Sequence, residues 1–292
     1  MFKAYCAEKL TLIEEELKRI VDEDTAYSKT LCEAMNYSLM AGGKRLRPIL
    51  LMAAADAVGG NGEDYKKASC AIEMIHTYSL IHDDLPAMDN DDYRRGKLTN
   101  HKVYGEGMAI LAGDALLTMA FEVICRQKGV SAERLLKVAC EMSTAAGANG
   151  MVGGQAIDLL SENKKIDRET LEKMHQGKTG ALFKAAIRSG AILANASDKQ
   201  LEQLTIYAEK FGLAFQITDD ILDVIGTQEQ IGKPVGSDER NNKSTYVTLE
   251  SLETAKLMAN QAVCDALDAL KDFGSEAEFL REVVKYLLAR KS

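Results

Sequence analysis

Apolar residues recur every three or four positions along most of the chain. The spacing is clearest in LTLIEEELKRIVDE at 10–23, AERLLKVACEM at 132–142 and QLEQLTIYAEKFGLAFQITDDILDVI at 200–225. This period places the apolar side chains of each segment on one face of an α-helix. Ala, Leu, Glu, Lys and Met, which favour helices, are abundant, and the alternation typical of strands is scarce. The pattern therefore predicts an all-α protein.

Turn-forming residues separate the periodic segments. Glycines gather at 59–62, Lys128-Gly129 precedes the second segment, and a polar stretch covers 161–167. Ser131 and Asp167 each stand immediately before a periodic run and are predicted helix N-caps. Only three prolines occur, and no Gly-, Ser- or Pro-rich linker divides the chain. We therefore expect residues 1–292 to form a single domain.

Composition narrows the class of protein. Apolar residues make up 46% and charged residues 27%, which is typical of a soluble globular protein. The net charge of −8 argues against nucleic-acid binding, which needs clustered Lys and Arg. The six cysteines form no CxxC pair and lie mostly in apolar helical contexts, which predicts buried, reduced thiols.

The chain shows no pattern of a secreted or membrane-spanning protein. Acidic residues appear within the first twenty positions, where a signal peptide would have an apolar core. The longest apolar stretch, GMAILAGDALLTMAF, is interrupted by Asp114 and is too short to span a bilayer. We expect a cytoplasmic protein without a membrane span.

Two acidic clusters follow apolar helical runs. In the second, DDILD at 219–223, Asp219 and Asp223 lie one turn apart on one helix face, and Gln216 lies one turn before Asp219. Like charges at this spacing cost a helix about 0.2–0.5 kcal/mol, which a bound divalent cation would offset. A solvated helix end is the alternative explanation.

The first cluster, HDDLPAMD at 82–89, departs from helical spacing. Asp83 and Asp89 would not share a face of a straight helix, but Pro86 should end or bulge the helix near Asp84 and return Asp89 toward Asp83. Mg²⁺ commonly binds through one or two carboxylates and completes its shell with water and phosphate oxygens. The two clusters are therefore candidate Mg²⁺ ligands facing each other across a cavity.

Basic residues flank both clusters and suit phosphate binding. They lie in GGKRLRP at 42–48, where the glycines predict a loop that carries all three of its basic residues. They also lie in the RR pair after the first cluster, in HQGKTGALF at 175–183, and after the second cluster. Any one of these basic residues, taken alone, is more simply explained as a charged residue on the protein surface. The candidates are Lys44, Arg45, Arg47, Arg94, Arg95, Lys178, Lys233 and Lys243, with Thr179 beside them.

Seven short motifs, taken in their order along the chain, resemble those of the trans-isoprenyl diphosphate synthases, most closely the bacterial farnesyl diphosphate synthases. They are GGKRLRP, HDDLPAMD, RRG, MVGGQ, GKTGALF, FQITDDILD and KSTY, and they extend from about residue 36 to residue 250. The resemblance implies a bundle of about ten or more helices around a central apolar cavity, the isoprenoid synthase fold. It also implies a homodimer and, with the allylic diphosphate bound, three Mg²⁺ ions. Val247 departs from the proline that the family commonly has there.

The resemblance implies roles for residues at matching positions. Those implied to bind Mg²⁺ are Asp83, Asp84, Asp89, Asp219, Asp220 and Asp223. Those implied to bind the allylic diphosphate are Arg94, Lys178, Lys233 and Lys243. Those implied to bind isopentenyl diphosphate are Lys44, Arg47, His76 and Arg95. Lys178, Thr179 and Gln216 are the implied catalytic residues, with Thr179 and Gln216 facing the reacting carbons.

The implied reaction is ionisation of the allylic diphosphate, condensation with isopentenyl diphosphate and loss of a proton. Cationic clamps neutralise the leaving group, and an apolar cavity protects the carbocation from water. Tyr78 and Ser79 lie a little over one turn before Asp83, so a growing tail along this helix would meet the Tyr78 ring. The resemblance associates an aromatic residue there with a C15 product, (2E,6E)-farnesyl diphosphate. Geranylgeranyl and geranyl diphosphate are the alternative products.

Three other classes of protein fit parts of the sequence pattern. An HD-type metal phosphohydrolase would use His76 and His82-Asp83 but leaves GGKRLRP and the second cluster unexplained. We interpret His82 instead as a packed helix residue. A class I terpene cyclase should carry an Asn/Ser/Glu triad in place of the second cluster. A non-catalytic helical module would not bind diphosphate with Mg²⁺. Arg290 and Lys291 are interpreted as exposed charges, the alternative being closure over isopentenyl diphosphate.

Overall fold

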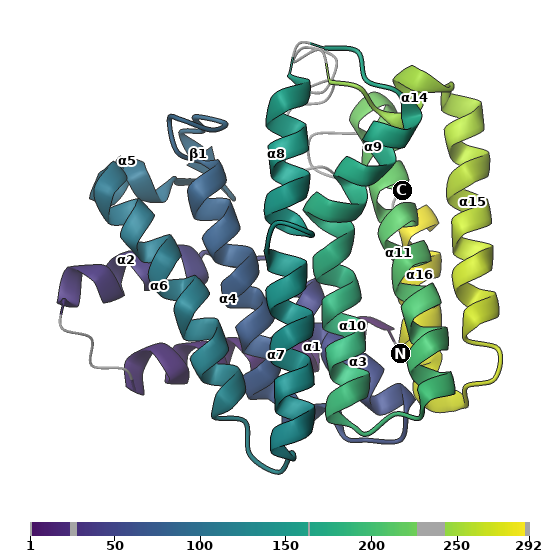
Figure 1. The fold of residues 1–292 in the computed structure, drawn as a ribbon, viewed down its shortest axis with the longest axis horizontal. Helices are drawn as coiled ribbons and strands as arrows, with labels where there is room; N and C mark the ends of the chain where they lie inside the picture. Colours follow the sequence, from purple (N-terminus) through teal and green to yellow (C-terminus); the bar gives the residue numbers. More distant parts are fainter. Residues whose placement is uncertain (1, 24–27, 163, 227–242, 290–292) are drawn as a thin grey trace.

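The computed structural model describes residues 2–23, 28–162, 164–226 and 243–289. Within these ranges the chain is almost entirely helical, as predicted (Figure 1). The helices are α1 (Phe2–Glu23), α2 (Lys29–Leu39), α3 (Leu46–Ala57), α4 (Lys66–Asp83), α5 (Asn100–Tyr104), α6 (Glu106–Cys125), α7 (Ala132–Ala146), α8 (Met151–Ser161), α9 (Arg168–His175), α10 (Ala181–Leu193), α11 (Asp198–Ile225), α14 (Tyr246–Leu249), α15 (Leu252–Ala269) and α16 (Glu278–Ala289).

Short elements connect these helices. The 3₁₀ turns η1 (Gly62–Tyr65) and η3 (Ser275–Ala277) precede α4 and α16, and η2 (Gln176–Gly180) is a π-helical turn between α9 and α10. The strands β1 (Tyr93–Arg94) and β2 (Lys97–Leu98) form an antiparallel hairpin that the sequence pattern did not predict.

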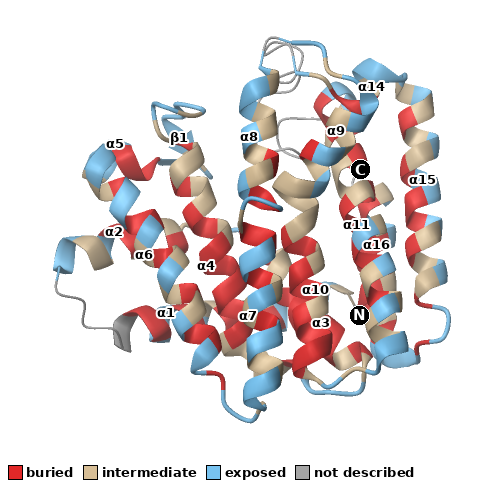
Figure 2. Ribbon diagram, viewed as in Figure 1, coloured by how far each residue is buried: buried red, intermediate tan, exposed pale blue. Residues whose placement is uncertain are grey.

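The core lies at the centre of the bundle. Helices α3, α4 and α10 are buried over most of their length (Figure 2). Helix α4 packs along α6, α3 packs along α10, and α11 packs along α15. Gly190 of α10 permits the close approach to α3, because a Cβ there would overlap the carbonyl oxygen of Leu51. The buried centre therefore fixes the direction in which α4 delivers its acidic end.

Polar side chains define several helix starts. Ser131 accepts a hydrogen bond from the backbone N–H of Arg134, and Asp167 accepts one from that of Thr170 at 2.8 Å. These contacts confirm both predicted N-caps, which satisfy N–H groups that lack intrahelical partners.

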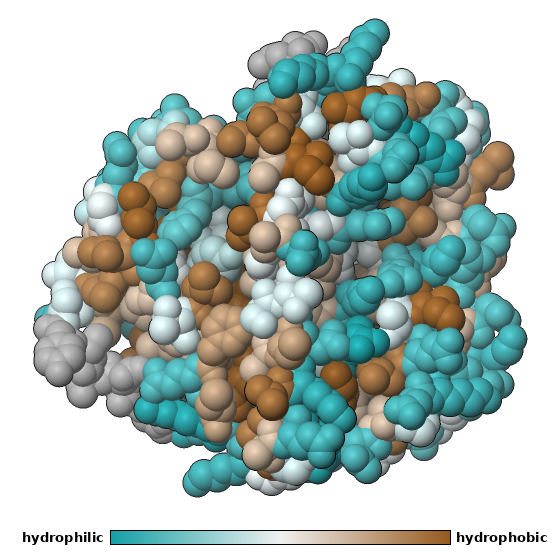
Figure 3. Space-filling view, viewed as in Figure 1, coloured by the Kyte–Doolittle hydropathy of each residue, from teal (hydrophilic) through white to brown (hydrophobic). Residues whose placement is uncertain are grey.

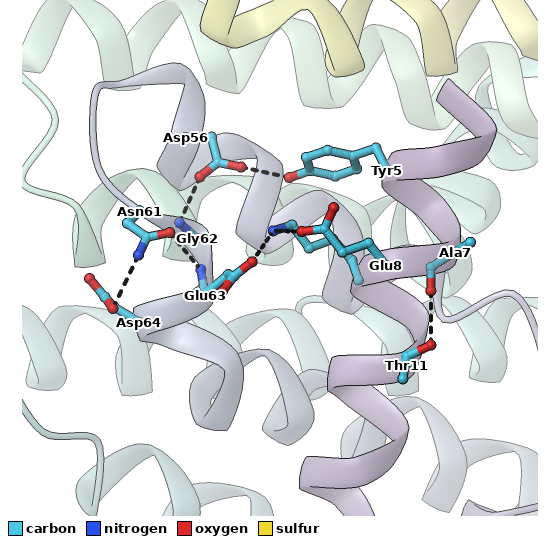
Figure 4. A network of polar contacts seen from close by, with 10 residues as sticks. Tyr5, Ala7, Glu8, Thr11, Asp56, Asn61, Gly62, Glu63 and Asp64 are labelled. Atoms are coloured by element: carbon cyan, nitrogen blue, oxygen red, sulfur yellow. Dashed lines mark hydrogen bonds and ion pairs between the residues drawn. The ribbon is translucent and has the colours of Figure 1, made fainter. Parts of the chain in front are cut away.

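Helix α1 is attached to the bundle by polar contacts (Figure 4). The Tyr5 hydroxyl donates to Asp56 at 2.6 Å, and Lys9 pairs with Glu63 at 2.7 Å. Asp56 also accepts from the backbone N–H of Gly62 at 2.6 Å. One carboxylate therefore joins α1 to the end of α3 and to the following 3₁₀ turn.

Arg45 is a structural residue of the core. Its guanidinium is fully buried, donates to Glu73 at 2.8 Å and donates to the carbonyl oxygen of Leu39 at 2.7 Å. Arg45 precedes α3 with a left-handed φ of 46°, and Arg47 already lies in the first turn of α3. The expectation that all three basic residues of GGKRLRP occupy a loop was therefore wrong for Arg47.

Helix α6 is long and apolar enough to cross a membrane when judged by length and composition alone, with a mean hydropathy of 1.8. The sequence expectation had treated this stretch as too short. A single such helix is weak evidence for a span, because core helices of soluble proteins have the same properties. Only part of α6 is buried here, along the face that contacts α4.

All six cysteines are free, but their predicted burial was wrong for half of them. Cys70 is buried and Cys6 and Cys32 are half-buried, whereas Cys125, Cys140 and Cys264 are exposed. Cys125 is the last residue of α6, and Cys140 and Cys264 lie within α7 and α15, where apolar sequence neighbours do not ensure burial.

The Arg45–Glu73 pair provides a test of the core. We expect Glu73→Gln to lower the free energy of unfolding by about 3 kcal/mol, because it leaves the buried Arg45 charge with only the partly exposed carboxylate of Glu14, 3.7 Å from its Nε. Urea unfolding followed by circular dichroism is suitable, since the chain contains no tryptophan.

Glu133→Gln is the matched control, because Glu133 pairs with Lys137 on an exposed face of α7. This control should leave the urea midpoint unchanged. Equal midpoints for the two variants would refute the structural importance of the buried pair.

Candidate active site

The first acidic cluster lies where α4 ends. The helix stops at Asp83, as Pro86 predicted, and the backbone N–H of Leu85 donates to His82 O at 3.2 Å. The N–H of Asp89 then donates to Asp83 O at 2.9 Å, so the chain turns back on the helix end. The predicted return of Asp89 toward Asp83 is confirmed.

Asp84 is paired with Arg94 of the hairpin. Both the Nε and Nη2 atoms of Arg94 lie 2.6 Å from Asp84 Oδ1, and the Asp84 carboxylate is nearly fully buried. Burial raises the pKa of Asp84 despite the opposing charge of Arg94. Burial likewise raises the pKa of Asp83 to about 6, with Lys178 opposing and Asp89 reinforcing the shift. Such crowding of acids favours a cationic ligand.

The segment that carries Lys178 and Thr179 is the π-helical turn. Such turns are rare and often occur at functional sites. Gly154 of α8 packs directly on it, because a Cβ at Gly154 would overlap the backbone nitrogen of Lys178. This close approach explains the second glycine of MVGGQ and places Asp158, one turn later, beside Lys178. The Lys178 ammonium and Asp158 Oδ2 lie 2.6 Å apart.

Helix α11 supplies the second acidic cluster. Asp220 and Asp223 are buried, and Asp220 accepts a hydrogen bond from the Tyr246 backbone N–H at 2.8 Å. Gln216 and Asp219 line a cavity of about 310 Å³ together with Asp220. Other residues that line this cavity include Asp158, His175, Lys178, Thr179 and Lys243.

Lys178 connects the two clusters. It lines the cavity with Asp219, and it is close enough to Asp83 and Asp89 for their charges to act on it. Burial opposes the charge of Lys178, but the surrounding carboxylates, Asp158 foremost, raise its pKa above the ordinary value. Lys178 therefore lies within reach of the charges at the end of α4 and lines one cavity with Asp219 of α11.

A second basic group lies beside the α4 cluster. Arg47 stacks on the Phe183 ring with its guanidinium carbon 4.5 Å from the centroid, and its buried Nε has no hydrogen-bond partner in the described part of the chain. Burial lowers the pKa of Arg47 to about 10. Burial and the charges of Arg47 and Arg95 hold the pKa of His76 well below its usual range, so His76 is neutral.

The remaining candidates occupy varied positions. Arg95 donates to the carbonyl oxygen of Gly42, and Lys44 lies on the exposed loop before α3. Tyr78 is buried in α4 with its ring edge-on to His82, while Ser79 donates to the carbonyl oxygen of His76. Lys233, Arg290 and Lys291 fall outside the described residues.

Asp158 and His175 are among the cavity residues that were not candidates in the sequence analysis. Asp158 is an acidic position within the otherwise apolar MVGGQAIDLL, and this interruption was the available signal. His175 lies one helical turn before Lys178, but nothing in its spacing indicated its contact with Gln216. Both depend on helix packing rather than on local pattern.

The donor set suits Mg²⁺. Within the described ranges, no three His, Cys, Asp or Glu side chains converge to enclose a metal alone. Carboxylates on two separate helices, with basic residues between them, instead suit an ion whose shell is completed by water and phosphate oxygens. The residues present therefore fit Mg²⁺ with a phosphorylated substrate.

Comparison with known proteins identifies the class. Residues 28–287 match the model of the polyprenyl synthetase family, and the chain belongs to this family. It is 53% identical over 260 residues to the farnesyl diphosphate synthase of Micrococcus luteus, covering 89% of each chain. It is 45% identical to the geranylgeranyl diphosphate synthase of Cyanophora paradoxa, covering 98% and 95%. A crystal structure of an FPP/GFPP synthase from Zymomonas mobilis superposes with a TM-score of 0.88 at 38% identity, covering 98% of each chain.

The glycine contact at the π-helical turn can be tested. Gly154→Ala should lower the free energy of unfolding by about 2 kcal/mol, because the added methyl group meets backbone that cannot rotate away. Thermal unfolding followed by circular dichroism measures the effect.

Gly180→Ala is the control within the same turn, since its Cβ would make only an ordinary 3.6 Å contact with His175 O. Similar melting temperatures for the two variants would show that the close approach of α8 is not required.

Proposed function

We propose that this chain is a Mg²⁺-dependent short-chain prenyltransferase. It condenses isopentenyl diphosphate with dimethylallyl or geranyl diphosphate and forms (2E,6E)-farnesyl diphosphate. The observation that carries the proposal is the position of Lys178, which lines the cavity with Asp219 and senses the charges of Asp83 and Asp89. Family membership supports it, since such synthases generally depend on Mg²⁺ and use prenyl diphosphates.

The aspartates are proposed to hold the metal ions of the allylic site. Three Mg²⁺ ions, when bound with the substrate, would neutralise the diphosphate and so promote its departure. The residues that would hold them are Asp83, Asp84 and Asp89 on the first cluster, and Asp219, Asp220 and Asp223 on the second.

Basic residues are proposed to bind the allylic diphosphate directly. Lys178 and Lys243 line the cavity, and Arg94 lies at the first cluster, where it is now bound to Asp84. Lys233 is assigned by resemblance alone. Because a diphosphate carries several acceptor oxygens, it can take over the donors that Asp84 and Asp158 now occupy.

Isopentenyl diphosphate is proposed to bind the second basic group. The unpartnered Nε of Arg47 supports this, because a buried guanidinium N–H without an acceptor is costly and a phosphate oxygen would satisfy it. Neutral His76 can donate one N–H, and Arg95 adds charge nearby. Lys44, on the preceding loop, would complete this site.

Ionisation leaves an allylic cation beside the cavity wall. The hydroxyl of Thr179 and the amide of Gln216 line that cavity and would direct their negative ends at the cation. The double bond of isopentenyl diphosphate then forms the new carbon–carbon bond. Proton loss to the released diphosphate completes the reaction, so no protein nucleophile is needed.

The length of the isoprenoid product is assigned to side chains of α4. Tyr78 is buried five residues before Asp83, with Ser79 beside it, and its ring would block a tail that extends along α4. Relatives named farnesyl and geranylgeranyl diphosphate synthase both match this chain, so overall similarity does not select the product. The C15 product rests on Tyr78 and on the association of an aromatic residue at that position with this chain length.

We also propose that the single domain of residues 1–292 acts as a cytoplasmic homodimer. Hydrophobic side chains gather over α6 and the adjacent faces of α7 and α8 (Figure 3). Ile110 and Leu111 of α6 are 44% and 54% exposed, and Leu136 of α7 is 71% exposed. A second copy would bury this surface.

The reaction itself is the first test. Protein incubated with dimethylallyl diphosphate, isopentenyl diphosphate and Mg²⁺ should yield a C15 diphosphate by mass spectrometry, and chelation by EDTA should abolish it. Release of phosphate without chain elongation would instead favour the metal phosphohydrolase and refute the proposal.

Tyr78→Ala should shift the main product from C15 toward C20, because removal of the ring opens space for another isoprene unit. Mass spectrometry of the extracted products measures the distribution. Tyr246→Phe is a control, since Tyr246 is a buried aromatic residue that stacks on His175 rather than lying in α4. An unchanged C15 product from Tyr78→Ala would eliminate Tyr78 as the stop.

The proposed dimer can be tested by introducing a charged residue into the exposed apolar surface of α6. The native protein should sediment with a mass near twice 31.9 kDa, and Leu111→Lys should shift it toward the monomer. Leu257→Lys on α15 is the control, because Leu257 is 72% exposed and lies away from α6 (Figure 1). A monomeric native protein would contradict the assignment.

A further inference from the structure

His175 links three elements at the cavity. It is the last residue of α9, immediately before the π-helical turn. Its Nδ1 lies 2.9 Å from the amide nitrogen of Gln216 on α11. Its ring stacks on Tyr246 of α14 with the centroids 5.6 Å apart and an interplanar angle of 22°. The imidazole is therefore held on both sides, and the proposed function assigns it no role.

His175 is neutral at physiological pH. Burial lowers its pKa to about 4, and the ammonium groups of Lys178 and Lys243 add to this effect against the carboxylate of Asp158. A neutral imidazole has one N–H donor and one bare nitrogen acceptor. The structure places the amide nitrogen of Gln216 at this contact, and an amide nitrogen can only donate, so Nδ1 is the acceptor. The proton then lies on Nε2, which is buried and has no hydrogen-bond partner among the described residues.

This tautomer determines which end of the Gln216 amide is free. With the amide N–H donating to His175, the carbonyl oxygen Oε1 is the end left for the cavity that Gln216 lines. A carbonyl oxygen stabilises a developing positive charge, whereas an amide NH₂ group would repel it. We propose that His175 is a positioning residue that fixes the Gln216 amide with Oε1 toward the allylic cation.

The same chain of contacts restrains the imidazole. Tyr246, which stacks on it, is itself anchored by the hydrogen bond from its backbone N–H to Asp220. The second acidic cluster thus supports the orientation of the amide through Tyr246 and His175. This inference rests on the proposed function, because it concerns the same reacting carbons.

Two substitutions separate orientation from simple packing. His175→Leu keeps an apolar volume but removes the acceptor, and His175→Asn places an amide oxygen near the position of Nδ1. We expect His175→Leu to lower kcat about 10- to 100-fold with KM for the allylic diphosphate changed less than about twofold. His175→Asn should recover most of this loss, and thermal unfolding of both variants checks that they fold.

A double-mutant cycle tests whether His175 acts through Gln216. In the Gln216→Leu background, the further change His175→Leu should lower kcat by less than about twofold. If His175→Leu lowers kcat by the same factor with and without Gln216→Leu, the two residues act independently and the inference is overturned. So would a His175→Leu enzyme with the kcat of the native protein, or equal losses in the Leu and Asn variants.

Nuclear magnetic resonance can determine the tautomer of His175 without measuring enzymatic activity. The ¹⁵N shifts of the imidazole, assigned by the signal missing from His175→Asn, should show protonated Nε2 and bare Nδ1. A protonated Nδ1 would overturn the proposed amide orientation. A native protein that makes no prenyl product would refute the proposed function instead, while this tautomer result would stand separately.

Discussion

The ammonium of Lys178 lies within reach of the charges of Asp83 and Asp89 and lines the same cavity as Asp219, and the site depends on this balance of charge. Asp83 and Asp84 carry raised pKa values because burial penalises their charges. Without cations the acidic ends of α4 and α11 would repel each other. The protein supplies some positive charge itself, through Lys178 and Arg94, and leaves the remainder to ligands. A magnesium diphosphate has both the charge and the oxygen ligands that such a site requires.

This arrangement is delivered by close backbone packing. The π-helical turn carries Lys178 and Thr179 out of the regular helical phase, and Gly154 lets α8 approach it closely enough for Asp158 to hold the ammonium. On the opposite wall, α11 presents Gln216 and Asp219 one turn apart. The buried centre of α3, α4 and α10 fixes these elements relative to one another (Figure 2). Catalytic geometry and core packing are thus parts of one structure.

Local pattern predicted what depends on local physics. Helical periodicity, the N-caps at Ser131 and Asp167, and the break imposed by Pro86 all act within a few residues, and each is confirmed. The contacts of Asp158 and His175 join residues 20 and 41 positions apart, so no local spacing reveals them. The π-helical turn results from packing against neighbouring helices, which a single-segment pattern does not encode. The prediction that the cysteines are buried failed for the same reason, since burial depends on which face of a helix meets a neighbour.

The most direct test of the shared site is a crystal structure with Mn²⁺ in place of Mg²⁺ and an allylic thiolodiphosphate that resists ionisation. Anomalous scattering locates the ions independently of the protein model. The account predicts ions on both clusters, with the ligand's phosphate oxygens contacting ions held by Asp83 and by Asp219 and with Lys178 at the same diphosphate. Ions confined to one cluster, or a diphosphate bound away from Lys178, would contradict it.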